Sequence, residues 1–498
     1  MLWNVSIFEK NVLSNVKNLT IMTLSLSRSV RKHNIKGVVV VVKKLLLSVG
    51  ALLMLFPAMA FAADEGPSTA MLNMGLNSVW ILVSFILVLL MQGGFILLET
   101  GSTRMKNAGH VAGKTIFTVG LCTLIYWAFG YGIFNGSDEI SAGLKKFIGW
   151  GDFFFDPTVA GGEGDSYPIT TFFLFQLAFA TISLSIAWGG FAERAKLSVY
   201  LVFTVLFSIF VYPVVAHWIW GGGWLAQDGA QDYAGSTVVH LTGALAAMAA
   251  TILLKPRIGK FNKDGSSNEI LGHNQVFSAL SVLLLWVGWF GFNAGSALGV
   301  GDGFFGFVAF NTMLGAGAGT VAALLISWAI TGKADITTTL NGALAGLVAI
   351  TASCAFVDPW AAVVIGLVAG VLVFFSAKLF EKLRIDDPIF ALSVHGAAGV
   401  WGTLANGIFA TKDLAEKVGV GKGGLIDTGS WHQLWVQFES VAVSGAYVLI
   451  VSFIILGVMK LVMGLRVTEE QEIIGLDLSE HGTYGYPEQM KKSNNIQA

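Results

Sequence analysis

The sequence predicts an all-α protein that crosses a membrane many times. Its mean hydropathy is +0.70. Of its 498 residues, 54% are hydrophobic and 12% charged, whereas a soluble domain carries roughly 25% charged residues. Apolar runs of about 20 residues, each long enough for one bilayer crossing, recur along the chain. The 60 glycines, many in clusters such as GAGAG at 315–319, favour close helix packing in lipid. The expected surroundings are therefore a lipid bilayer, and no nucleic-acid partner is indicated.

The first segment is expected to be a leader that is not part of the mature fold. Lys43 and Lys44 precede the apolar run at 45–56, and Ala60-Phe61-Ala62 follows it. This is the order of a secretory signal peptide, with cleavage after Ala62. An uncleaved additional helix is the alternative. The predicted divisions of the chain are a leader, a membrane domain and a cytoplasmic regulatory tail, at 1–62, 63–463 and 464–498.

Eleven membrane-spanning helices are expected after the leader. Each is an apolar stretch of suitable length, and charged or glycine-rich segments separate them. In chain order the stretches are 75–98, 112–134, 169–190, 197–218, 233–254, 274–294, 304–330, 336–356, 359–381, 389–410 and 433–463.

The distribution of basic residues predicts the direction of these helices. If the mature N-terminus is outside, the loops alternate and the C-terminus is inside. The inner set then has fifteen basic residues: Arg104, Lys106, Lys114, Arg194, Lys196, Lys255, Arg257, Lys260, Lys263, Lys333, Lys378, Lys382, Arg384, Lys460 and Arg466. The outer set has five: Lys145, Lys146, Lys412, Lys417 and Lys422. An excess of lysine and arginine on the inner side is the usual pattern of membrane proteins.

Two related segments predict an inverted repeat. DYAGSTVVH (232–240) and DPIFALSVH (387–395) each place a histidine eight positions after an aspartate, and the histidines are 155 residues apart. His240 falls in the fifth span, which runs inward, and His395 in the tenth, which runs outward. Related segments of opposite direction indicate two inverted five-helix halves with a site near the midplane. The eleventh helix is long and lies outside this repeat.

The two histidines are the first candidate site. An ionisable side chain at bilayer depth is costly and usually belongs to a pathway, a relay or a ligand site. A core imidazole hydrogen-bonded between helices is one alternative, and heme ligation is another. Cytochrome-type helices usually carry more histidines, and no cluster of cysteines or carboxylates indicates a metal site. No metal or other cofactor is therefore expected.

The aspartates are expected to cap helices. Eight residues of helix rise about 12 Å and turn about 80° beyond two full turns, so Asp232 cannot contact His240 along one face. An aspartate at a helix start accepts hydrogen bonds from the first free backbone N–H groups. Asp387, just before Pro388, can do the same in the second segment. An effect of Asp232 on an arriving cation remains the alternative.

Aromatic side chains mark the expected outer mouth. Trp220 lies in HWIWGGGWL (217–225), although a tryptophan at this depth is often only an interfacial anchor. Phe292 and Ser296 are four positions apart and share a helix face. Phe179 lies about 15 Å below the outer end of its span, where it could be either a core residue or a gate. Aromatic faces with one hydroxyl favour a small, weakly hydrated cation.

Several long motifs in this sequence resemble those of the ammonium transporter (Amt/Mep/Rh) family. The resemblance covers about residues 70–485, and the tail is similar to that of the bacterial Amt branch. The segments that carry it are ETGSTRMKN (99–107), GFAERAK (190–196), HWIWGGGWL (217–225), DYAGSTVVH (232–240), GWFGFNAGS (288–296), DDPIFALSVHGAAG (386–399) and GLRVTEEQEIIGLDLSEHG (464–482).

The resemblance implies a homotrimer in a bacterial inner membrane, with one pore in each subunit. Trp220, Phe179 and Ser296 match the family's external ammonium recruitment site, and Phe179 with Phe292 resembles its stacked phenyl gate. His240 and His395 match the twin histidines of the pore. Asp232 matches the aspartate near the pore entrance. The tail would bind a trimeric nitrogen-signalling protein of the P-II class.

The function expected from this resemblance is transport of ammonium or ammonia, with methylammonium as an analogue. An ammonium sensor with little net flux is the alternative. A sensor would normally have a kinase, cyclase or response domain after the eleventh span, where about 35 residues follow. An enzyme is not expected, because no nucleophile–base pair or metal cluster is evident.

Overall fold

A computed structural model describes residues 68–138, 140–157 and 166–489 of the chain. The fold described below is that of the unit Ser68–Ala498. The expected leader and its cleavage position after Ala62 lie outside the described residues, so both stay predictions.

The described residues form helices and loops, with three isolated bridges and no named strand among them. The helices before the middle of the chain are α3 Thr69–Ser102, η1 Met105–Asn107, α4 Ala108–Ile125, η2 Tyr126–Gly130, α5 Tyr131–Asn135, α6 Ala142–Lys145, α7 Ile169–Ala187, η3 Trp188–Gly190, α8 Leu197–Phe210, α9 Tyr212–Ile219, α10 Trp224–Gln227, η4 Ser236–Leu241 and α11 Thr242–Leu254. Those that follow are α12 Gln275–Trp289, η5 Phe290–Ala294, α13 Phe304–Thr331, α14 Ile336–Ser353, α15 Pro359–Lys382, η6 Leu392–Ala397, α16 Ala398–Phe409, α17 Lys412–Val418, α18 Leu425–Thr428, α19 His432–Val462, α20 Glu469–Ile474 and α21 Leu476–His481.

The expected class, an all-α polytopic membrane protein, is confirmed. Within the described part of the chain, ten helices are long and apolar enough to cross a membrane. The stretch expected as the tenth span consists of the six-residue η6 and the twelve-residue α16, and it is not among those ten. The number eleven therefore stays a prediction. Helix α19, expected as the long last span, has 31 residues.

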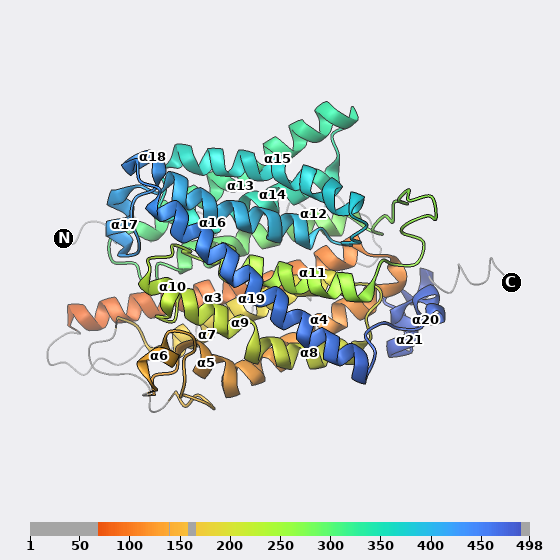
Figure 1. Cartoon of the computed structure of the whole chain (residues 1–498), viewed down its shortest axis with the longest axis horizontal. Coiled ribbons are helices and arrows are strands. Elements are labelled where there is room, and N and C mark those ends of the chain that lie inside the picture. Colours follow the sequence, from red (N-terminus) through yellow and green to blue (C-terminus); the bar gives the residue numbers. More distant parts are fainter. Residues whose placement is uncertain (1–67, 139, 158–165, 490–498) are drawn as a thin grey trace, which may run out of the picture. The chain divides into compact units, whose positions relative to one another are not determined.

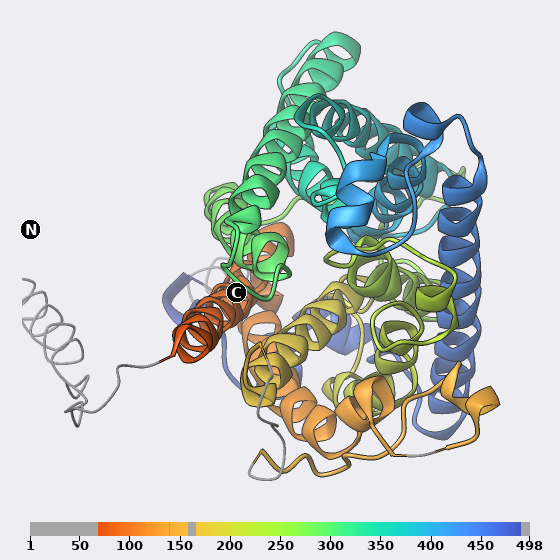
Figure 2. The same ribbon diagram turned by 90° about the vertical axis from the view of Figure 1, so that its left-hand side faces the viewer.

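The long helices run side by side, and α19 crosses over them (Figure 1). It contacts α8 from the first half of the sequence and also α11 and α16. Seen from one end, α13–α16 form one group and the helices from α4 to α9 another, with α19 along the side of both (Figure 2). The last long helix therefore connects the two groups.

Small residues allow the closest helix contacts, as the glycine clusters predict. Helix α13 packs against both α14 and α15. A methyl group added at Gly319 of α13 would lie 2.4 Å from the backbone oxygen of Gly342 in α14. One added at Gly370 of α15 would lie 2.3 Å from the oxygen of Gly319. These backbones meet only because no side chain stands between them.

The aspartate caps expected from the sequence are present. Asp232 accepts hydrogen bonds from four backbone N–H groups, those of Gly235, Ser236, Thr237 and Val238, at 2.7–3.0 Å. Gly235 turns the chain into η4 with φ +116°, a backbone conformation that other residues rarely adopt. Asp232 is buried at the start of the segment that ends in His240.

Asp387 caps the second segment in the same way but accepts fewer hydrogen bonds. Its two carboxylate oxygens accept from the N–H groups of Ala391 and Leu392, at 3.0 and 2.8 Å. The two segments thus share an aspartate cap as well as a histidine. This likeness supports the predicted inverted repeat.

A buried group of charges joins four segments at the end of the bundle that carries the tail. Arg257 contacts Asp386 at 2.9 Å and Glu193 at 3.0 Å, and Glu193 also pairs with Arg104 at 2.8 Å. Arg257 had been expected only as part of a cytoplasmic loop. The pairs connect the segments that follow α3, α7, α11 and α15. We name Arg104, Glu193, Arg257 and Asp386 the inner charge cluster.

The cluster stays ionised at neutral pH. Burial alone would raise the pKa of Glu193, but the charges of Arg257 and Arg104 lower that pKa to about 2. Burial also opposes ionisation of Asp386, whereas hydrogen bonds and charge from Arg257 lower its pKa to about 2. Both carboxylates have a lower pKa in the folded state. Their contribution to stability is therefore present above roughly pH 4 and lost as the pH falls toward 2.

Removing the central cation should destabilise the fold strongly. Arg257→Met leaves Asp386 without its ion-pair partner and Glu193 with Arg104 alone, and breaking a buried pair typically costs about 3–5 kcal/mol. Lys260→Gln is the matched control, because Lys260 pairs at 2.8 Å with Glu381, whose side chain is 45% exposed. The control should cost less than about 1 kcal/mol. Denaturation of the purified chain, followed by tryptophan fluorescence, measures the free energy of unfolding of both variants. Equal losses of stability in the two variants would contradict the role given to the cluster.

The two aspartate caps should differ in importance. Asp232→Ala removes the acceptor for four N–H groups and should cost about 2 kcal/mol or more, at the upper end of measured capping effects. Asp387→Ala removes the acceptor for two and should cost about 1 kcal/mol. The same denaturation experiment compares them. A larger loss of stability in Asp387→Ala than in Asp232→Ala would show that the number of capped N–H groups does not determine the size of the loss.

Candidate functional site

The two histidines predicted from the sequence lie against each other. Their Nδ1 atoms are 3.2 Å apart, and the ring centroids are 5.2 Å apart with planes inclined by 16°. His240 is fully buried and His395 is 5% exposed. One ring nitrogen must donate and the other accept, so the two tautomers depend on each other.

The second nitrogen of His240 has no partner. Its Nε2 atom is buried and forms no hydrogen bond within the described residues. A buried polar nitrogen without a partner is unfavourable, and such atoms often mark a place where a ligand or water binds. The unpaired nitrogen is therefore a candidate contact for a small polar molecule.

Each histidine lies on a widened helical turn. Both η4, which carries His240, and η6, which carries His395, are π-helices. Phe292 lies on a third such segment, η5. Short π-helical segments are rare and occur frequently at functional sites. The sequence pattern did not predict these wide turns, because their residues fit an ordinary α-helix equally well.

The predicted gate residues lie against each other with tilted rings. Phe179 from α7 and Phe292 from η5 have ring centroids 4.2 Å apart, and both are buried. Trp220 stands edge-on to Phe179 at 5.7 Å. Phe292 lies 5.5 Å from the ring of His240. Trp220, Phe179, Phe292, His240 and His395 thus form one continuous row of rings, which we call the ring row.

Two polar contacts fix the outer part of the ring row. Trp220 donates its indole N–H to the backbone oxygen of Asp232 at 2.7 Å, so the capping aspartate also orients the tryptophan. Ser296 is half-buried and donates its hydroxyl to the backbone oxygen of Phe292 at 2.9 Å. The shared face of Phe292 and Ser296 is as expected. Asp232 contacts Trp220 and not His240, in agreement with the helical geometry.

Two aromatic neighbours of the histidines were not predicted as site residues. Trp289 stacks on His240 at 5.2 Å, and its indole N–H donates to Thr351 at 2.8 Å. Phe95 lies 6.3 Å from His395. Trp289 precedes Phe292 by three positions, a spacing that places both on one helix face, so the sequence did contain a signal for it.

The tail, expected to be a docking region for a partner, packs on one end of the bundle. Glu472 pairs with Arg466 at 2.7 Å and accepts from the N–H of Ile258 at 2.8 Å. Lys106 donates to the backbone oxygens of Glu472 and Ile473, both at 2.6 Å. Glu472 is buried, which differs from the solvated acidic helix that composition alone would suggest. The tail also lies at the end of the bundle where the sequence places most basic loop residues.

Asp477 connects the tail to the start of α4. Its carboxylate accepts from the backbone N–H groups of Gly109 and His110, at 3.0 and 2.7 Å. The Nδ1 of His110 lies 3.0 Å from Nε2 of His481. His110 is fully buried on α4, and with His481 it joins the tail to the bundle. Neither histidine was given a role from the sequence.

Lys114 was counted among the basic residues of the inner side, at the start of the expected span 112–134. It is fully buried within α4 and pairs with Glu99 of α3 at 2.7 Å. The helix begins at Ala108, four positions before the expected start of that span. The buried carboxylate of Glu99 allows the helix to include the lysine.

Metal binding finds no support in the described part of the chain, where no group of three or more histidine, cysteine or carboxylate side chains could hold a metal ion. The expected absence of a cofactor stays a prediction.

Comparison with known proteins gives consistent relationships. A model of the Ammonium Transporter Family matches residues 79–486. Ammonium transporter Amt2 of Archaeoglobus fulgidus is 39% identical over 460 residues, which covers 88% of this chain and 94% of that protein. An ammonium transporter of Bacillus subtilis is 37% identical over 416 residues, covering 83% and 99%.

Solved structures agree with the fold. A structure titled Sensor Amt Protein has a TM-score of 0.76 and 36% identity, covering 82% of this chain and 99% of its own. Mep2 of Candida albicans has a TM-score of 0.72 and 29% identity, covering 80% and 87%. With a family model that matches most of the chain and relatives of this identity, the chain belongs to the ammonium transporter family.

Proposed function

We propose that this chain transports ammonium across a membrane and passes it along the ring row as ammonia. The observation that carries the proposal is the continuous series from Trp220 through the phenylalanine pair to His240 and His395, with ring centroids 4.2–5.7 Å apart. The names of the relatives, which are ammonium transporters, support the same substrate. The role of each residue follows from its chemistry.

The outer residues would recruit the cation. Trp220 and Phe179 present aromatic faces, which attract a small cation through the ring quadrupole. Ser296 supplies a nearby hydroxyl oxygen. Ammonium and potassium have the same charge and similar size, so selection must use the proton that only ammonium can release. Ammonium would release its proton to water at the outer mouth before ammonia passes Phe179 and Phe292, because a bare cation is costly to bury among phenyl rings and neutral ammonia is not.

The histidine pair would guide the neutral molecule. Ammonia can both donate and accept hydrogen bonds, and the free Nε2 of His240 can act as either partner, depending on its tautomer. The short contact to His395 could also pass a proton between the rings. Asp232 would act indirectly, by holding η4 and Trp220 in place.

A sensor is the second candidate function. The observation that favours it is the 36% identity to the structure titled Sensor Amt Protein. Currents across a planar bilayer that contains the purified chain, recorded with ammonium, methylammonium and potassium, separate the two candidates. An ammonium-dependent flux supports transport, whereas binding without flux supports a sensor.

The assembly and orientation also belong to this proposal. The chain is proposed to form a homotrimer in a bacterial inner membrane, with its C-terminus inside. Packing of the tail beside the basic loops supports that orientation, as Arg466 donates to the backbone oxygen of Leu254 at 2.7 Å. A P-II class protein is the proposed partner at the tail.

Loss of either ring-row histidine should impair transport. His240→Asp and His395→Ala should each lower methylammonium uptake about tenfold or abolish selectivity against potassium, since an unmade hydrogen bond in a buried site costs roughly 1–3 kcal/mol. Uptake is measured in cells that lack their own ammonium transporters. His432→Ala is the control, because His432 is exposed at the start of α19 and should leave uptake unchanged. Normal uptake and selectivity in both variants would remove the pair from the mechanism.

Release of the tail should lower uptake and abolish partner binding. Asp477→Ala removes the acceptor for backbone N–H groups of α4, so residues 469–481 should exchange their amide hydrogens faster. Deletion of 466–498 should remove binding of a P-II class protein. Glu469→Gln, a change at an exposed position of α20, is the control for the point substitution. If the deletion leaves both uptake and P-II binding intact, the tail has no regulatory role.

A further inference from the structure

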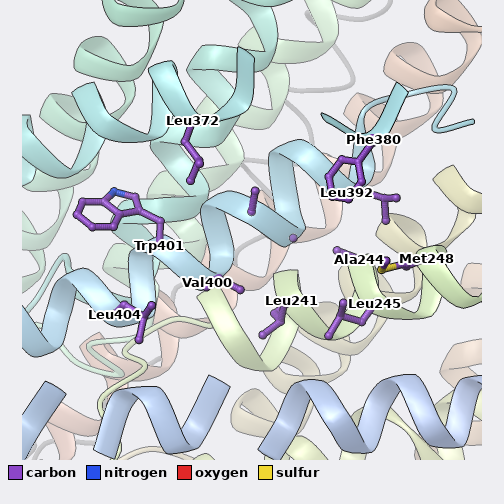
Figure 3. A pocket seen from close by; sticks show the side chains of 12 residues that line it. Leu241, Ala244, Leu245, Met248, Leu372, Phe380, Leu392, Val400, Trp401 and Leu404 are labelled. Atoms are coloured by element: carbon purple, nitrogen blue, oxygen red, sulfur yellow. The ribbon is translucent and has the colours of Figure 1, made fainter. Parts of the chain in front are cut away.

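An apolar groove lies behind the histidine pair. It has a volume of about 470 Å³ and is lined by side chains of α11, the η6–α16 segment and α15, among them Leu241, Met248, Leu372, Phe380, Leu392 and Trp401. These side chains point into a common space (Figure 3). The volume is within the usual range of small-molecule sites. Water is a poor occupant, because the one indole N–H of this wall, that of Trp401, already donates to Ile365 at 3.0 Å.

We propose that this groove binds an acyl chain of a membrane phospholipid. Its length fits, since the wall from Leu392 to Leu404 covers twelve residues of helix, roughly 18 Å. One leaflet of the hydrocarbon core is about 15 Å thick. Phe380 lies two positions before the end of α15, so one end of the groove is at the level where a phospholipid headgroup meets water.

The surroundings of the groove are the surface that lipid covers. On α15, Val371, Phe375 and Leu379 are 36–52% exposed, and on the neighbouring α19 Ile450 and Ile454 are each 60% exposed. These residues belong to helices long and apolar enough to cross a membrane. Acyl chains would reach the groove from this apolar surface, whereas a water-soluble ligand would have to cross lipid.

The bound chain would support the two histidine segments from behind. Leu241 follows His240 in η4, and Gly396 follows His395 in η6, and both line the groove. An acyl chain there packs against the same two π-helical turns that present the imidazoles to each other. Filling the groove therefore steadies the contact between His240 and His395. This second step rests on the proposed transport function, whereas lipid binding does not.

Lipid retention tests the groove directly. The full chain is purified in its native oligomer, reconstituted with phosphatidylcholine, washed in mild detergent and weighed by native mass spectrometry. Val400→Trp and Leu372→Trp fill the groove and should retain about tenfold less phospholipid. Val371→Trp is the matched control, one position away on α15 and outside the lining, and should retain as much as the unchanged chain. Equal retention in all variants would overturn the proposal.

A second measurement does not depend on the folding of bulky variants. Bromine on acyl chains quenches the fluorescence of nearby tryptophans. The contribution of Trp401 is the difference in fluorescence between the unchanged chain and Trp401→Phe. This difference should be absent in brominated vesicles and present in ordinary ones. A Trp401 signal insensitive to bromine contradicts lipid in the groove. A change in oligomer mass in Val400→Trp, with lipid retained, would assign the groove to a second copy and also overturn the proposal.

Transport is then measured separately. Methylammonium uptake should fall in Val400→Trp and not in Val371→Trp. If the unchanged chain retains lipid but carries no methylammonium, the transport proposal is wrong and the lipid-binding proposal is supported. If uptake is normal and no lipid is retained, only the lipid-binding proposal is wrong.

Discussion

The fold depends on a requirement that membranes impose: each polar backbone group in the interior must find a partner within the protein. Asp232 meets this requirement for four N–H groups at once and Asp387 for two. These carboxylates allow the chain to enter the bundle on widened turns. The widened turns hold His240 and His395 with their Nδ1 atoms 3.2 Å apart. A contact between two imidazoles in the core thus depends on carboxylates several residues away.

The same requirement explains why charges lie deep in this molecule. Glu99 with Lys114, and the inner charge cluster around Arg257, are buried as neutralised sets. Arg257 links loops that follow α7, α11 and α15, and the neighbouring Ile258 donates to Glu472 of the tail. The tail and the histidine segments are therefore joined through a few hydrogen-bonded residues, because Asp386 of the cluster immediately precedes the capping Asp387.

Much of this could be predicted from the sequence because the signals are local or repeated. Apolar length predicts the membrane helices, and the shared Asp-to-His spacing singled out both histidines and their caps. The burial of Lys114 and His110 was not predicted, because their partners lie on other helices: Glu99 on α3, and Asp477 and His481 on α21. The π-helical turns depend on tertiary packing, which no single-segment pattern contains. The spacing of Trp289 and Phe292 places both on one helix face, but the stacking of Trp289 on His240 depends on the neighbouring segment.

The facing Nδ1 atoms leave room for a single hydrogen between the two rings. The pair therefore has two alternative tautomeric arrangements. Passing the shared proton across converts one into the other when one proton arrives at Nε2 of the donating ring and another leaves Nε2 of the accepting ring. A second proton cannot follow in the same direction until both imidazoles return to their first arrangement. Any charge movement through this contact must include such a reset in every cycle, whereas passage of a neutral molecule alone leaves the pair unchanged and ready for the next one.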